Sequence, residues 1–450
     1  MFGLFKPKYP VSLREKVWAE LRMADLANEF GLERMLSAGV VLPTNDYFPD
    51  TYNGSEADAK RLLDRVCKFM GADVTKIDFR VRADDEMSDA AGFYEPGTRA
   101  ITVIQSQLDE KKSLIAILAH EVAHDLLLHG KQLRGDEDDH EQITDLLTVF
   151  LGMGVFAANT AVKQTVSHDA TWHYWSIRKL GYLTARVYGY SFALREWIRG
   201  DINPRWTWCL GDDAKYALRD GLKYLTKTDD SLFRRDFDKK YLSDRPITEL
   251  VSDLAHPSET VCVAALWSLG EQKEKAADSV GALIECLRER STAVRSEAAL
   301  ALGSIGEPAR EATSVLMGIL RSPEAENRAA AATAIGLIRP ALDHMGPDES
   351  TLYDELAILQ GDQSRNVTLA AADALTSYGQ GCSQLAPRLL SSLKRALIEC
   401  DFLTVDHYLR VLMAIIPDID QFLERELATD AELFEHVTYS LNELRLQHSR

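Results

Sequence analysis

Apolar residues recur at every third or fourth position along much of this chain, a spacing that predicts amphipathic helices. The pattern predicts helices over residues 11–38, 55–70, 141–160, 171–199 and 212–227. Ser55 is suited to cap the start of the second helix, and Gly71 is suited to end it. Two stretches alternate instead, KIDFRVR (76–82) and TRAITVIQ (98–105), and predict strands, the second of them an edge strand.

A further helix is expected around LAHEVAHDLLLHG, residues 118–130, which has apolar residues on both flanks. Asp109 is placed to cap its start, and Gly130 follows its last turn. The next apolar stretch, residues 143–162, is nearly long enough to span a bilayer but carries Asp145. We expect a buried core helix there, with a membrane segment as the alternative.

The second half of the chain repeats. After a charged segment at 228–246, expected to be a linker, Gly270, Gly303 and Gly336 recur every 33 residues, and a looser copy follows 40 residues later. Each copy comes after an apolar helix pattern, which predicts stacked helix pairs in an α-solenoid. The residues AVRSEAALALGSIG resemble HEAT repeats, in particular the short variety of phycobilisome lyases, over about residues 247–380. Less regular helices follow as a cap.

Composition narrows the class of protein. A chain of 450 residues is expected to form two or three domains. Its net charge of −18 argues against nucleic acid or an anionic membrane surface as the main partner. The six cysteines are scattered without a C-x-x-C pair, and the N-terminus lacks an apolar signal region. We therefore expect a cytoplasmic protein.

The motif His120-Glu121-x-x-His124 carries the candidate chemistry. Two histidines four residues apart lie on one face of a helix, where both imidazoles can reach one Zn²⁺ at about 2 Å. Glu121 lies about 100° round the helix, beside the metal, where it can take a proton from zinc-bound water. The sequence therefore predicts one catalytic zinc per chain, with Glu121 as general base.

A catalytic zinc needs a third protein ligand. His129 points about 140° away from His124 on the same helix, and Gly130 occupies the place of the third metzincin histidine. Glu141 and Asp145 form an E-x-x-x-D pair at the start of the next helix. From the residues alone, His140, Asp145 and His129 remain alternatives to Glu141.

The HExxH and ExxxD pair resembles the gluzincins, the thermolysin-like clan of zinc peptidases, over about residues 76–160. The resemblance implies that Glu141 is the third ligand and that Asp145 hydrogen-bonds a ligating histidine. It also implies a His or Tyr that stabilises the oxyanion of the tetrahedral intermediate. Candidates for that donor are His168, His173, Tyr174, Tyr182 and Tyr188. A peptide substrate is expected to add to the strand at 98–105.

Together these patterns predict a mainly α protein, with a small α+β zincin-like domain followed by an α-solenoid of HEAT-like repeats. The expected parts are an N-terminal helical region (1–75), a metallopeptidase domain (76–227), the linker (228–246) and the solenoid with its cap (247–450). The predicted function is a zinc peptidase acting on peptides or proteins. The alternatives are a non-catalytic HEAT adaptor with a relic zincin domain and a membrane-associated metallopeptidase.

Two acidic regions bear on partners. Residues 247–450 hold 31 Asp and Glu against 17 Lys and Arg, a net −14 of the total −18. Such a solenoid is expected to recruit a protein with a basic segment and to repel nucleic acid, although the charge is equally explained by solubility. The run at 136–141 is expected to be a solvated loop, or else a negative cleft mouth that favours basic peptides.

Overall fold

The structure is a computed structural model. It describes residues 9–84, 92–129, 139–164, 183–233, 245–338, 348–398, 402–428 and 430–448. The chain divides into two compact units, Met1–Leu242 and Ser243–Arg450. The division lies within the charged segment 228–246, of which residues 234–244 are outside the described residues.

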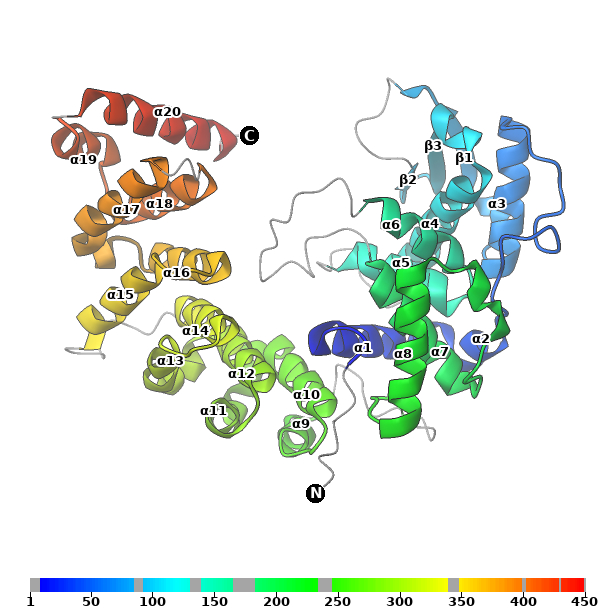
Figure 1. Cartoon of the computed structure of the whole chain (residues 1–450), viewed down its shortest axis with the longest axis horizontal. Helices are drawn as coiled ribbons and strands as arrows, with labels where there is room; N and C mark the ends of the chain where they lie inside the picture. The colour runs from blue at the N-terminus through cyan, green and yellow to red at the C-terminus, as the bar shows by residue number, and fades with distance from the viewer. Residues whose placement is uncertain are drawn as a thin grey trace. The chain divides into compact units, whose positions relative to one another are not determined.

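The first unit combines helices with a small sheet, which packs against α4 (Figure 1). Its helices are α1 (Leu13–Phe30), α2 (Leu32–Ser37), α3 (Glu56–Met70), α4 (Lys111–His129), α5 (His140–Phe150), α6 (Val155–Gln164), α7 (Ala185–Arg199) and α8 (Asp212–Thr228). Its strands are β1 (Asp78–Arg82), β2 (Gly92–Glu95) and β3 (Ala100–Ile104). The N-terminal helices belong to this same compact unit, since α1 packs against α5 and α7, and α3 packs against α4.

Several predicted helices are confirmed, and one is divided. Ser55 caps α3 through its hydroxyl, which accepts a hydrogen bond from the backbone N–H of Asp58, and Gly71 ends the helix. The predicted helix over 11–38 is two helices, α1 and α2, separated at Gly31. The helix predicted over 171–199 is described only from residue 183 onward, where α7 begins at Ala185.

The sheet has the order β1-β3-β2. Strand β3 runs parallel to β1 and antiparallel to β2, with Phe93 opposite Thr102 and Tyr94 opposite Ile101. The prediction that 98–105 forms an edge strand is therefore wrong, because β3 is hydrogen-bonded on both sides. The strand beside α4 at the sheet edge is β2, which the sequence pattern missed because four residues are too few to establish an alternation.

Helix α4 is the centre of this unit. It packs against α3, α5, α6 and β2, and most of its residues are buried. Its cap is Glu110 rather than the predicted Asp109: the Glu110 carboxylate accepts the N–H of Ser113 at 2.7 Å, whereas Asp109 ends a preceding 3-10 turn. The helix that carries the HExxH motif is thus held on several sides by the fold.

The apolar stretch at 143–162 does not form one helix. It is divided between α5 and α6 at Gly152, which has a left-handed φ of 86°. The backbone of residues 39–41 packs closely here, because Val41 donates its N–H to the Gly152 carbonyl at 2.9 Å and a Cβ on Gly152 would lie 2.1 Å from the Gly39 oxygen. The predicted single helix over 141–160 is therefore wrong. Among the described helices, none is long and apolar enough to cross a membrane.

The second unit is built from helix pairs. Its helices are α9 (Ile247–Asp253), α10 (Glu259–Glu271), α11 (Val280–Glu289), α12 (Thr292–Ile305), α13 (Thr313–Ile319), α14 (Ala325–Ile338), α15 (Asp348–Leu359), α16 (Arg365–Tyr378), α17 (Ala386–Ile398), α18 (Phe402–Ile415), α19 (Ile419–Glu426) and α20 (Ala431–His448). The even-numbered helices from α10 to α18 pack in succession, and each also packs against the odd-numbered helix before it (Figure 1). The predicted stack of paired helices is confirmed.

The recurring glycines are the points where successive helices come close. A Cβ on Gly303 would lie 2.9 Å from the Cα of Ala334, and one on Gly336 would lie 2.8 Å from the Cα of Ala374. Only a residue without a side chain allows α12, α14 and α16 to approach this closely. The 33-residue period therefore reflects helix packing. The longer interval of 40 residues before the last copy includes residues 339–347, which lie outside the described residues.

Candidate metal centre

Helix α4 presents His120 and His124 from adjacent turns of its buried face. Both residues are 8% exposed, and their ring centroids lie 4.7 Å apart with the ring planes nearly perpendicular. Their Nε2 atoms approach to 3.1 Å. Two imidazole nitrogens therefore face one point beside the helix, as the i, i+4 spacing predicts.

Helix α5 brings a carboxylate to the same point. Glu141 Oε2 lies 3.0 Å from His120 Nε2 and 3.4 Å from His124 Nε2, and the three donor atoms fall within 4.8 Å of one another. A tetrahedral ion with donors about 2.0–2.1 Å away holds those donors about 3.3 Å apart. The two nitrogens and one carboxylate oxygen therefore have both the chemistry and the spacing of three zinc ligands.

The outer nitrogens of both rings have partners that orient them. His120 Nδ1 lies 2.9 Å from Asp145 Oδ1, and His124 Nδ1 lies 3.4 Å from the Thr144 hydroxyl oxygen. The second Asp145 oxygen accepts the backbone N–H of Leu183 at 3.0 Å. A histidine that donates from Nδ1 to a carboxylate leaves Nε2 free to ligate a metal, so Asp145 lies where it can select that tautomer.

The electrostatics of the group match a cation site. Burial lowers the pKa of His120. The hydrogen bonds to Asp145 and Glu141 outweigh this effect and raise the pKa to about 10. Burial raises the pKa of Glu141, but the two histidines outweigh this and hold that pKa well below its usual range. The group thus has a strong preference for positive charge at its centre, which a proton or a metal cation can satisfy.

Glu121 lies beside the donor group and is not part of it. It is 5% exposed, and burial raises its pKa to about 7, with His120 acting to lower it and Glu141 to raise it. Strand β2 passes close by, since a Cβ built on Gly92 would lie 3.0 Å from Glu121 Oε1. A carboxyl whose pKa lies near neutrality can both take and return a proton at neutral pH.

The alternative third ligands are not members of the donor group. His129 Nδ1 lies 3.2 Å from the Tyr94 hydroxyl and outside the donor group, as its position on the helix predicts. The His140 ring stacks on His124 with centroids 4.9 Å apart, but its nitrogens are not members of the donor group. Asp145 faces the outer nitrogen of His120. Among the described residues, Glu141 completes the group.

Most predicted oxyanion donors fall outside the described residues. His168, His173, Tyr174 and Tyr182 lie in 165–182, and Tyr188 is buried within α7. Of the acidic run at 136–141, residues 139–141 are described: Asp139 is the N-cap of α5, which begins at His140. Asp139 is buried rather than solvated, and it accepts hydrogen bonds from Trp18 and Arg22 of α1.

One further cluster around α4, formed by Asp125, Tyr94 and Arg99, was not anticipated. Asp125, which follows His124, accepts the Tyr94 hydroxyl at 2.8 Å and two hydrogen bonds from the Arg99 guanidinium at 2.9 and 2.6 Å. This pairing ties β2 and the β2–β3 turn to the helix that carries the HExxH motif. Asp125 is indistinguishable in sequence from any other helical aspartate, and Tyr94 lies 31 residues before it.

Comparisons with known proteins bear on the second unit. A family model described as HEAT repeats matches residues 247–336, so this part of the chain carries HEAT repeats. The finer resemblance to the phycobilisome-lyase variety stays a prediction. A search of curated proteins finds no match.

Two solved structures of engineered proteins are similar to the chain. One is 21% identical with a TM-score of 0.31, and covers 44% of this chain and 96% of its own. The other is 17% identical with a TM-score of 0.34, and covers 95% of this chain and 99% of its own.

Proposed function

We propose that this protein is a zinc-dependent peptidase whose HEAT repeats recruit a substrate or partner. The supporting observation is the convergence of His120, His124 and Glu141, with donor separations of 3.0, 3.1 and 3.4 Å. Glu121 separates this proposal from a purely structural zinc site. A structural site has no use for a buried carboxyl beside the ligands with a pKa near neutrality.

The chain's own residues supply binding and proton transfer. His120, His124 and Glu141 would hold the metal, and Asp145 would keep His120 in the ligating tautomer. A bound Zn²⁺ supplies Lewis acidity and a water molecule of lowered pKa. Glu121 takes the proton of the attacking water and delivers it to the leaving amine, which its raised pKa of about 7 allows in both directions.

A peptide is the substrate class that strand β2 favours. β2 is an edge strand beside Glu121, and its Phe93 side chain is 52% exposed. An extended peptide can pair with such an edge through main-chain hydrogen bonds and so bring its scissile bond along the metal-binding helix. We therefore assign the pairing with a peptide substrate to β2 and not to the strand at 98–105, which the sequence pattern had indicated.

A second candidate function is that of an adaptor, in which the HEAT repeats bind a protein and the metal centre only stabilises the fold. The HEAT match at 247–336 supports it, because stacked repeats present extended surfaces for protein partners. The acidic composition of residues 247–450 favours a partner with a basic segment over nucleic acid.

Metal analysis and peptide cleavage together distinguish the two functions. We expect about one Zn²⁺ in the purified full chain, loss of the metal in His120→Ala, and cleavage of a peptide library only by the zinc-loaded wild type. Equal metal content in the wild type and His120→Ala would rule out the zinc site. Zinc bound through His120 without cleavage of any peptide would favour the adaptor.

A further inference from the structure

The residue just before α5 has an unusual role for an N-cap. Asp139 occupies the N-cap position, but its side chain makes no capping hydrogen bond to its own helix. Aspartate is favoured at N-caps because it accepts such a bond, and the cap contributes about 1 kcal/mol. Here the carboxylate is turned to another helix and accepts its hydrogen bonds from there.

The other helix is α1. Asp139 Oδ2 accepts the Trp18 Nε1–H at 2.7 Å and the Arg22 Nε–H at 2.8 Å, while Oδ1 accepts Arg22 Nη2–H at 3.1 Å. The side chain of Asp139 is 8% exposed and that of Arg22 is 22% exposed, so this two-pronged ion pair is partly shielded from water. Bidentate arginine–carboxylate pairs fix geometry as well as contributing energy.

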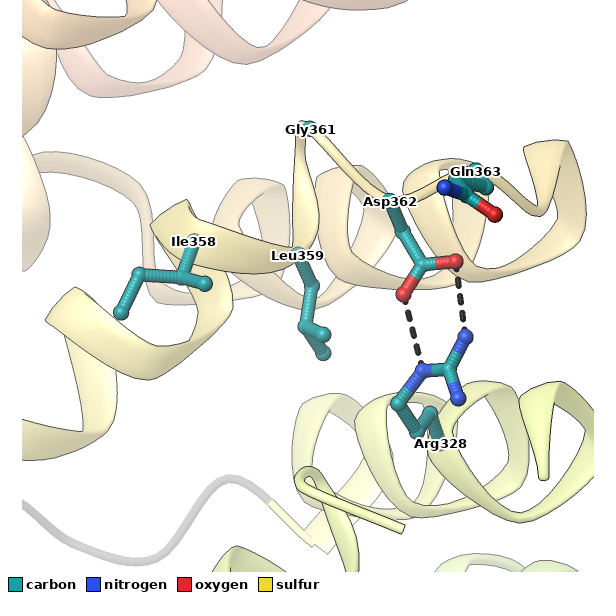
Figure 2. Close-up of a pocket in the computed structure, with 6 residues that line it drawn as sticks. All are labelled: Arg328, Ile358, Leu359, Gly361, Asp362 and Gln363. Atoms are coloured by element: carbon teal, nitrogen blue, oxygen red, sulfur yellow. Dashed lines mark hydrogen bonds and ion pairs between the residues drawn. The ribbon is translucent and has the colours of Figure 1, made fainter. Parts of the chain in front are cut away.

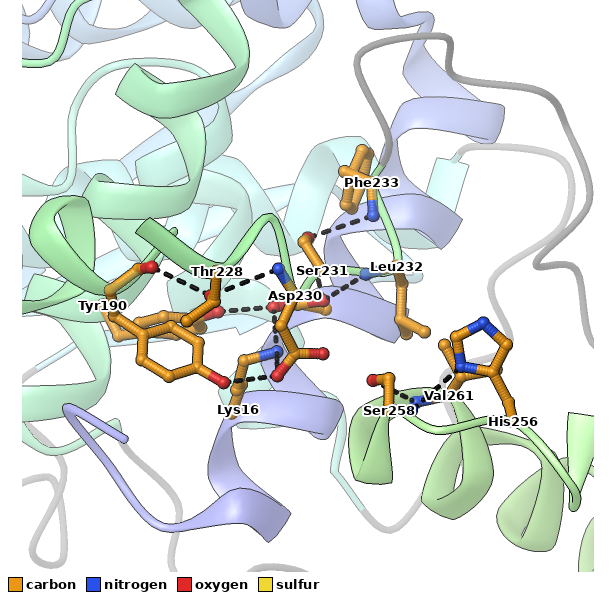
Figure 3. A network of polar contacts seen from close by, with 12 residues as sticks. Lys16, Tyr190, Thr228, Asp230, Ser231, Leu232, Phe233, His256, Ser258 and Val261 are labelled. Carbon is orange, nitrogen blue, oxygen red and sulfur yellow. Dashed lines mark hydrogen bonds and ion pairs between the residues drawn. The ribbon is translucent and has the colours of Figure 1, made fainter. Parts of the chain in front are cut away.

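Helix α1 is itself anchored on another side. Lys16 and Glu20, both fully buried, form an ion pair of 2.8 Å. Glu20 also accepts the Ser231 hydroxyl at 3.0 Å, the Leu232 N–H at 2.6 Å and the hydroxyl of Tyr190, and Figure 3 shows Lys16 and Tyr190 beside segment 228–233. Because these contacts hold α1 to α7 and to segment 228–233, the helix is a rigid support for Asp139.

Such a support matters most for Glu141. The side chains of His120 and His124 are each 10% exposed and lie well inside α4, whereas that of Glu141 is 44% exposed and lies in the first turn of α5. Helix ends fray, and this end has no side-chain cap of its own. Of the three donors, Glu141 therefore depends most on a contact from outside its helix.

We infer that Trp18 and Arg22 of α1 are positioning residues for the metal centre, which hold Glu141 in place through Asp139. The inference rests on the proposed zinc site, and it adds α1 to that site. Partners just beyond the ligands typically change metal affinity 10- to 100-fold when removed. Because Asp139 is two residues from Glu141, we expect an effect at the lower end, about 10-fold.

The test is the zinc affinity of the full chain, measured by competition with a chromophoric chelator. Arg22→Gln and Asp139→Asn should each bind Zn²⁺ about 10-fold more weakly than wild type. Trp18→Phe, which removes one hydrogen bond and keeps an aromatic ring, should weaken binding in the same direction by less.

Arg328→Gln is a matched control. Arg328 pairs with Asp362 in the HEAT unit through Nε at 2.8 Å and Nη2 at 2.9 Å, the same two-pronged geometry, at similar burial (Figure 2). Loss of this pair should leave zinc affinity unchanged. A fall in affinity equal to that of Arg22→Gln would mean that the loss of any such pair weakens binding, and would overturn the inference.

The remaining outcomes separate the inference from the proposed function. Wild-type affinity in Arg22→Gln overturns the inference and leaves the zinc site standing, whereas absence of zinc from the wild type overturns the proposed function. Metal-free Arg22→Gln could also unfold at a lower temperature than the wild type while the folded protein keeps its zinc affinity. That result would overturn the inference, because the contact would then serve folding alone. If Arg22→Gln does not fold, Trp18→Phe carries the test, and wild-type affinity there counts against the inference.

Discussion

Glu121 and Glu141 are two carboxylates of one small site, and their surroundings drive their pKa values apart. Burial raises the pKa of Glu121 to about 7 against the opposing effect of His120, while Glu141 faces two imidazoles that hold its pKa well below the usual range. Groups whose pKa values are separated in this way are suited to different tasks. Glu141 stays ionised and can hold a cation, whereas Glu121 can exchange a proton.

The first prediction follows from that division. Glu121→Gln should retain about one Zn²⁺ and a folded chain but cleave peptides roughly 10²-fold more slowly or worse, because general base and general acid are lost together. Metal content and cleavage of a peptide library by the two purified proteins measure this. Cleavage by Glu121→Gln at the wild-type rate would remove Glu121 from the mechanism.

Glu141→Gln tests the third ligand. The amide keeps the shape of the side chain but loses its charge, so zinc affinity should fall by at least 10-fold in a chelator competition. His129→Ala is the control, since the His129 ring contacts Tyr94 and lies outside the donor group. The ligand assignment is wrong if His129→Ala or His140→Ala weakens zinc binding and Glu141→Gln does not.

At the scale of elements, the HEAT unit depends on close helix contacts at its glycines. A Cβ on Gly336 would lie 2.8 Å from the Ala374 Cα, whereas one on Gly281 in α11 would meet no atom within 4 Å. Gly336→Ala should therefore lower the free energy of unfolding by about 1–3 kcal/mol. Gly281→Ala should be neutral or raise it by up to about 1 kcal/mol. Urea denaturation of both variants compares them, and equal midpoints would show that α14 and α16 can move apart without cost.

The Arg328–Asp362 pair predicts a pH dependence of the same unit. Burial raises the pKa of Asp362, but the hydrogen bonds from Arg328 and from the Ser364 N–H outweigh it, so the folded-state pKa is lowered. The unfolded value is about 3.9, so the pair stabilises the fold above that pH and the contribution is lost as pH falls through the lower folded value.

Arg328→Gln should accordingly have a lower urea midpoint than the wild type at pH 7, and the difference should shrink as the pH is lowered toward 2. Denaturation curves at several pH values give the comparison. A difference that stays constant down to pH 2 would show that Arg328 stabilises the unit through packing alone.

At the scale of the whole molecule, charge and chemistry are separated along the chain. The donor group lies in the unit Met1–Leu242, while residues 247–450 carry a net −14 of the total −18. A fragment of residues 243–450 should capture proteins with basic segments, and capture should weaken from low to physiological salt as exposed charges are screened. A pull-down at two salt concentrations tests this, with fragment 9–242 as the control. Equal capture at both concentrations, or nucleic acid as the main species, would exclude the acidic surface as the recognition element.

Local patterns were enough to predict several features of this protein. The His120–His124 pair depends only on helical periodicity, because residues four apart share a helix face wherever the helix packs. The stacked repeats depend only on the recurrence of Gly270, Gly303 and Gly336, because each unit meets its neighbour in the same way. The position of Glu141 beside the two histidines also agrees with the ExxxD pattern. The residues alone had left His140, Asp145 and His129 as alternatives to Glu141.

Tertiary packing decided the rest, because the groups involved are far apart in the sequence. Trp18 and Arg22 meet Asp139 across 121 and 117 residues, and no local pattern marks either partner. Gly152 divides an apolar stretch that periodicity presents as one helix, because the backbone at Gly39 packs against it. Strand β2 is too short to show an alternation, and it is defined by its hydrogen bonds to β3. The sequence by itself determined the helix faces and the repeat period, and only the fold decided which distant side chains meet on them.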